Sequence, residues 1–68
     1  MDTQPFSLEF ADSDSGSRAY IGARSDRGHI GLCLSLRDDG DVEIFMTPDI
    51  CEKLVTALQQ AWSQSLNH

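Results

Sequence analysis

The sequence predicts a small α+β domain in which a four-stranded antiparallel meander (ββββα) is followed by one C-terminal amphipathic helix packed on one sheet face. Apolar and polar residues alternate in several segments separated by turn sequences, which is typical of strands with one buried face. The C-terminal part instead shows helical periodicity. The 68 residues suffice for one small domain spanning 1–68. We expect strands at about 5–10, 18–25, 29–37 and 42–46 and a helix at about 48–65.

The first two strands are separated by a polar loop. Phe6, Leu8 and Phe10 alternate with polar residues and share one face. The loop at 11–17 is small, polar and acidic and has no apolar anchor, so we expect it to be flexible. The second strand carries its apolar residues at alternate positions: Ala19, Ile21 and Ala23.

The third strand has the strongest alternation. One face, called the leucine face below, carries Ile30, Leu32, Leu34 and Leu36. The opposite face, called the reverse face, is made of the small residues Gly31, Cys33 and Ser35. The leucine face is therefore the side on which the helix is expected to pack.

The pairing of the strands follows from the faces that must match. In an antiparallel pair of strands, the numbers of two residues that lie opposite each other always add up to the same sum. For the third and fourth strands this sum must be even, because only then do their apolar residues share one face. We expect 78, which pairs Leu36 with Val42 and leaves 38–40 as a loop with Gly40 in the left-handed region. The second and third strands require an odd sum, and 53 and 55 both satisfy the pattern.

The helix has a clear start and a wide apolar side. Thr47 is suited to the N-cap, Pro48 to the first helical position and Asp49 to the first turn. One apolar row, the helix stripe, comprises Ile50, Leu54, Ala57, Leu58 and Ala61, and a second row, the helix ridge, comprises Cys51, Val55, Trp62 and Leu66. The apolar side is wider than packing on one sheet requires. Val55, Trp62 and Leu66 are therefore candidates for a dimer contact.

The charge is strongly acidic and its placement is more informative than its size. Eleven acidic and five basic residues give a formal net charge of -6. In a meander the first loop and the third turn lie at the same end, whereas Arg24, Arg27 and His29 lie at the other. We therefore expect an acidic end that binds a basic partner surface, formed by Asp12, Asp14, Asp38, Asp39 and Asp41. Direct nucleic-acid binding is not expected, because such affinity depends on Lys and Arg.

The reverse face and one sheet edge are further candidate contact surfaces. A floor of small residues can accept another backbone closely. The side chains around this floor, which could bind a partner or a second copy, are Tyr20, Arg24, Cys33, Arg37 and Phe45. The strand at 42–46 is a candidate sheet edge for self-pairing.

No motif for catalysis, a cofactor or a metal ion is recognisable. The histidines are His29 and His68, and Cys33 and Cys51 lack zinc-ligand spacing. An EF-hand loop counted from Asp12 fails at its glycine and glutamate positions. We expect no enzyme, no metal and no cofactor. The sequence shows neither a signal peptide nor a membrane segment, so we expect a cytoplasmic protein with two free thiols.

These features predict a small acidic, non-enzymatic binding protein. The leading hypothesis is an inhibitor or regulator that occupies a basic, nucleic-acid-processing surface on a larger protein or complex, as in a phage or mobile-element anti-defence protein. The alternative is a structural homodimer or assembly subunit that uses its helix ridge, sheet face and edge strand.

Overall fold

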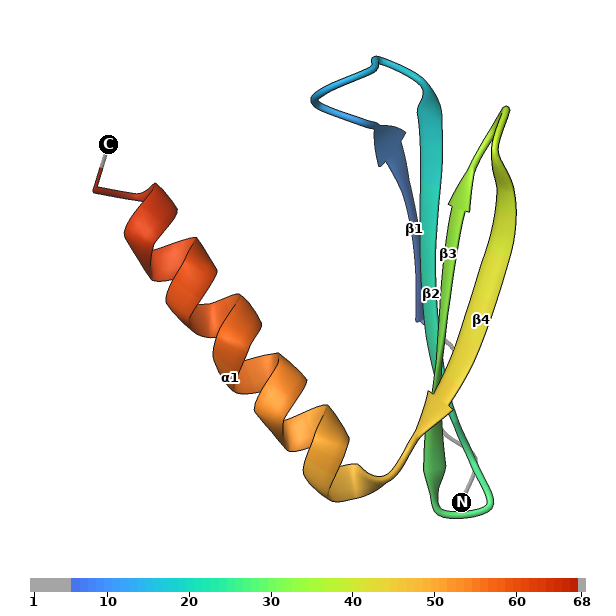
Figure 1. Ribbon diagram of the computed structural model, residues 1–68, viewed down its shortest axis with the longest axis vertical. Coiled ribbons are helices and arrows are strands. Elements are labelled where there is room, and N and C mark those ends of the chain that lie inside the picture. The colour runs from blue at the N-terminus through green and yellow to red at the C-terminus, as the bar shows by residue number, and fades with distance from the viewer. Residues whose placement is uncertain (1–5, 68) are drawn as a thin grey trace.

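The computed structural model describes residues 6–67 and has one antiparallel sheet followed by one helix. The strands run in chain order across the sheet, and the helix begins at its lower end (Figure 1). This arrangement confirms the α+β fold of ββββα type. The expected start of the first strand at residue 5 lies outside the described residues. The elements are β1 (Phe6–Ala11), β2 (Arg18–Asp26), β3 (His29–Leu36), β4 (Gly40–Met46) and α1 (Pro48–Ser65).

The faces of the strands pair as expected, but one register differs. In β2 and β3, Ile21 lies opposite Leu34, which is the pairing with a sum of 55. In β3 and β4, Leu34 lies opposite Val42, so the sum is 76 and the expected value of 78 is wrong. A shift of two residues keeps every side chain on its predicted face.

The turn between β3 and β4 explains this shift. The backbone N–H of Asp39 donates to the carbonyl of Leu36 at 3.1 Å, so the turn begins earlier than expected. Gly40 has a φ of 85°, in the left-handed region, as predicted. A left-handed glycine can end hairpin loops of more than one length, so its position alone does not fix the register.

The turn between β2 and β3 contains a conformationally costly arginine. Arg27 and Gly28 have φ values of 53° and 81°, and the flanking residues Asp26 and His29 are paired. This two-residue loop corresponds to a type I′ turn, which favours Asn-Gly. Arg27 therefore adopts a backbone conformation that arginine rarely occupies.

We expect Arg27→Asn to raise the free energy of unfolding by about 0.5–1 kcal/mol, because asparagine tolerates the left-handed region better. Urea unfolding followed by circular dichroism measures the change. Arg37→Asn is the matched control, since it removes the same charge from a turn without a positive φ at that residue. Equal changes for both variants would assign the effect to charge alone.

The helix begins where predicted. Thr47 is the N-cap with extended backbone angles of φ −75° and ψ 162°, and Pro48 occupies the first turn. The Thr47 hydroxyl donates to the Asp49 carboxylate and not to a backbone group. This bond is the main reason that the pKa of Asp49 lies below its ordinary value.

The expected packing of the helix across the leucine face is formed only near the start of α1. No residue of α1 is buried, and its contacts with the sheet are mainly to β3. One extended residue, Thr47, joins β4 to α1, and proline keeps the residue before it out of the helical region. The helix consequently leaves the end of the edge strand at an angle and stands away from the sheet (Figure 1).

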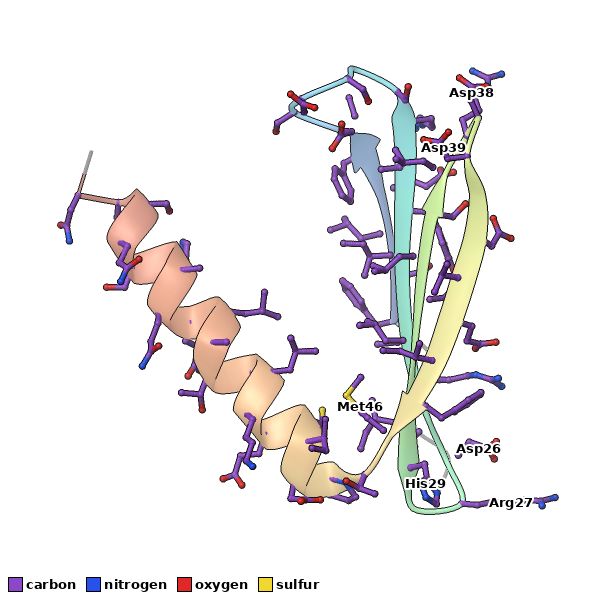
Figure 2. All side chains as sticks on the ribbon, viewed as in Figure 1. Asp26, Arg27, His29, Asp38, Asp39 and Met46 are labelled. Atoms are coloured by element: carbon purple, nitrogen blue, oxygen red, sulfur yellow. The ribbon has the colours of Figure 1, made fainter. Side chains whose placement is uncertain are left out.

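The chain consequently has a very small interior. Among residues 6–67 the buried hydrophobic residues are Ala19 and Met46, each 8% exposed. The radius of gyration is 13.6 Å, whereas a compact chain of this length has about 11 Å. Met46 lies at the junction of β4 and α1, where the sheet and the helix meet (Figure 2).

Candidate functional site

The leucine face forms a continuous apolar surface across all four strands. Apolar side chains without charged tips point from the sheet toward the side on which α1 lies, whereas polar tips point the other way (Figure 2). Much of this surface is open, and Val42 at the edge is 59% exposed. The strand pairings place on it Phe6, Leu8, Phe10, Ala19, Ile21, Ala23, Ile30, Leu32, Leu34, Leu36, Val42, Ile44 and Met46.

The apolar side of α1 is equally open. Cys51 and Leu54, near the sheet, are half-buried. Farther along the helix, Leu58 is 61% exposed and Trp62 is 66% exposed. All three candidate dimer residues, Val55, Trp62 and Leu66, are exposed. The structure therefore contains two large apolar surfaces on one chain that are not packed together.

A hollow of about 410 Å³ lies on the leucine face at the acidic end. Asp12 and Asp39 contribute to its lining, so carboxylates stand beside an otherwise mainly apolar depression. The apolar side chains that line it are Phe10, Ala19, Ile21, Leu34, Leu36 and Val42. The helix was expected to cover the leucine face, yet Leu34 and Val42 on this face are exposed. The single-residue connection before Pro48 is the sequence feature that could have indicated their exposure.

The two segments that carry the predicted acidic end lie at one end of the sheet. The loop between β1 and β2 and the turn between β3 and β4 lie at this end, and Figure 2 shows Asp38 and Asp39 at the tip of that turn. Asp14, Asp38 and Asp39 are exposed. Asp41, at the start of β4, lies at the same end and faces the reverse side, where its Oδ1 accepts a hydrogen bond from Ser35 Oγ at 2.8 Å. The ion pairs among residues 6–67 are Arg18–Glu9 and Arg24–Glu43, so none involves these five aspartates.

The acidic loop has a defined hydrogen-bond pattern. Asp12 Oδ2 accepts bonds from the Ser15 N–H at 2.8 Å and from Ser15 Oγ at 2.7 Å. The loop is closed by backbone bonds from Asp12 N to Ser17 O and from Gly16 N to Asp12 O, both 2.8 Å. These bonds order the loop locally, while its flexibility in solution stays a prediction.

We expect the Asp12 carboxyl to titrate below 3.8, because hydrogen bonds from the Ser15 side chain and backbone lower its pKa. The stability that the Asp12 carboxylate contributes to the folded protein is then fully present at a pH above the ordinary aspartate pKa. It is lost as the pH falls through the lower pKa that Asp12 has in the folded protein. A carboxyl-detected NMR titration measures this. Ser15→Ala removes the hydroxyl donor and should raise the Asp12 pKa toward 3.8, and an unchanged value would contradict the assignment.

The reverse face contains a hollow of about 190 Å³ whose lining includes Tyr20, Gly22, Gly31 and Cys33. A Cβ placed on Gly31 would lie 2.8 Å from Phe45 Cε1, and one on Gly22 would lie 2.8 Å from the Tyr20 hydroxyl oxygen. The two aromatic rings therefore cover the two glycines from within the same chain. That this floor accepts another backbone stays a prediction.

Of the other side chains predicted for the reverse face, Arg24 and Cys33 line this hollow and Arg37 lies apart from it. Arg24 lies 5.4 Å from the centre of the Phe45 ring and pairs with Glu43 at 3.2 Å, and Cys33 is half-buried. Arg37 follows β3 and lies at the acidic end, whereas Arg24 lies toward the opposite end. The structure therefore does not bring all five residues into one cluster.

The end opposite the aspartates has mixed charge. Asp26, Arg27 and His29 lie together at its turn (Figure 2). The start of α1 lies at the same end and adds Asp49 and Glu52 (Figure 1). The end expected to carry Arg24, Arg27 and His29 is therefore not purely basic, because the acidic first turn of α1 lies there as well.

The chemistry available to the described residues is limited. Among residues 6–67 no group of three or more His, Cys, Asp or Glu side chains could hold a metal ion. Cys33 and Cys51 are free, and His68 lies outside the described residues. Within the same part of the chain, no helix has both the length and the hydropathy to cross a membrane.

Comparison with known proteins adds no relative. No protein-family model, curated protein or solved structure matches this chain. The surfaces described above are therefore the basis for assigning a function.

Proposed function

We propose that this protein is a non-enzymatic binding protein that acts by associating with another polypeptide through its leucine face and the apolar side of α1. The observation that supports this is the exposure of both apolar surfaces, which extends to 61% at Leu58 and 59% at Val42. Contiguous apolar patches larger than a few hundred Å² are rare on isolated soluble proteins and mark interaction sites. We place the protein in the cytoplasm, where reducing conditions keep Cys33 and Cys51 as thiols.

A photo-crosslinking amino acid at Leu58 tests this function in cells that produce the protein. We expect covalent adducts with a polypeptide, because the partner covers the apolar side of the helix. The same group at Gln60, on the polar side of α1, is the matched control and should give few adducts. Equal yields at the two positions, or no adduct from Leu58, would contradict the proposed function.

A second candidate function uses the acidic end. The five aspartates of this end have no ion-pair partner among residues 6–67, and Asp12 and Asp39 share one hollow. Carboxylates arranged in this way can stand in for phosphates on a basic, nucleic-acid-processing surface. The protein would then be an inhibitor or regulator of a larger complex, as in a phage or mobile-element anti-defence protein.

Exchange of Asp38, Asp39 and Asp41 for asparagine tests the second candidate against any captured partner. We expect weaker binding and a smaller dependence of affinity on salt, since exposed charges are screened at high ionic strength. Isothermal titration at low and high salt measures both quantities. Asp26→Asn, at the opposite end, is the control. Unchanged affinity in the triple variant would exclude the acidic end as a binding site.

A further inference from the structure

One chain exposes more surface than a folded protein of its mass normally does. The accessible surface is 5826 Å², whereas a folded monomer of this mass has about 4,200 Å². The open leucine face and the open apolar side of α1 contribute to this excess of about 1,600 Å². A partner that covers both surfaces would bring the ratio of surface to mass toward the ordinary value.

We propose that this partner is a second copy of the chain, related by a two-fold axis, with α1 of each copy lying on the leucine face of the other. This inference rests on the proposed function and names the partner. Each copy contributes one uncovered helix and one uncovered sheet, so a single two-fold operation covers all four surfaces. A two-fold dimer needs no further element, because each copy supplies both a surface to be covered and the surface that covers it.

The area supports a stable dimer. Two separate chains expose about 11,700 Å², and a compact protein of twice the mass has about 7,000 Å². If association reduces the accessible surface of the two chains to about 7,000 Å², it buries about 4,600 Å² in total. This area falls within the range of obligate homodimers. One chain already has a radius of gyration of 13.6 Å, close to the value of about 14 Å for a compact protein of twice its length.

The two apolar rows of the helix fit this arrangement. A helix of 18 residues is about 27 Å long, whereas four strands span about 14 Å. The helix is therefore long enough to cross the partner sheet with its stripe. Its ridge, including Trp62, then remains for contact with α1 of the partner. Neither the helix stripe nor the helix ridge contains a charged side chain.

Sedimentation equilibrium of the purified chain tests the stoichiometry. We expect a species of twice the 7.5 kDa chain mass. Trp62→Glu should raise the dimer dissociation constant at least about 30-fold, the effect of removing a central interface residue. Ser63→Glu adds the same charge at the neighbouring position, outside both rows, and should leave the constant nearly unchanged. A folded monomer at all concentrations up to millimolar would overturn the inference.

Mixed crosslinking tests which surfaces meet. In a background of Cys33→Ser and Cys51→Ser, one chain carries Leu58→Cys and the other carries Leu34→Cys. We expect oxidation of the mixture to join the two different chains. A dimer that joins only chains of the same kind, or neither, would overturn the helix-on-sheet arrangement. Cellular adducts from Leu58 with a different protein, together with a monomeric purified chain, would leave the proposed function standing while this inference fails.

Discussion

Replacement of Met46 by alanine is expected to lower the free energy of unfolding by about 2–3 kcal/mol. Met46 is 8% exposed, is paired with Ile30 on β3 and stands immediately before the connection to α1. Its truncation removes apolar contacts at the place where the helix meets the sheet. Since a chain of this size gains only about 3–5 kcal/mol from its core, the loss is a large part of the total.

Urea unfolding followed by circular dichroism measures this effect. Met46→Leu is the matched control, because a volume-conserving apolar exchange costs less than about 1.5 kcal/mol. If both variants changed stability by less than about 0.5 kcal/mol, the value for exposed positions, Met46 would not be the residue that joins helix and sheet.

The elements of the fold could be predicted because their patterns are local. Alternation in 29–36 and helical spacing in 48–65 are properties of neighbouring residues, and both segments form the expected structure. Whether the sum of paired residue numbers is odd or even could also be predicted for each strand pair, since only one of the two places the apolar residues on one face. The shared location of the acidic loop and the third turn follows from the meander topology alone.

The remaining differences depend on contacts between elements. The shift of the β3–β4 register by two residues places Phe45 opposite Gly31, whereas the expected register would have placed it opposite Cys33. Phe45 therefore covers a glycine that sequence reasoning left open. Hydrophobic patterning cannot distinguish registers that differ by two residues, because both keep the same faces.

The position of α1 is the second feature that pattern alone does not determine. The apolar arc predicts that the helix is covered, and it does not specify which chain covers it. Thr47 and Pro48 limit how the helix can fold back on its own sheet, and the result is an exposed apolar side. The same sequence pattern is thus compatible with packing within one chain and with packing between two.

Leu58→Glu is expected to lower the free energy of unfolding by at least about 3 kcal/mol, because association would place its charge in an apolar interface. In an isolated chain the same exchange should change stability by less than about 0.5 kcal/mol. Leu58 is 61% exposed there, and leucine and glutamate have similar helix propensities. The variant therefore separates an associated helix from a solvent-exposed one.

Urea unfolding at two protein concentrations provides the measurement. For a dimer, the stability of the natural chain should rise by about 1.4 kcal/mol for each tenfold increase in concentration. Leu58→Glu should remove this dependence, because the variant no longer associates. Gln60→Glu adds the same charge to the polar side of α1, and its stability should still depend on protein concentration. A natural chain whose stability is independent of concentration, with both variants equally stable, would mean that the apolar side of α1 stays exposed to water.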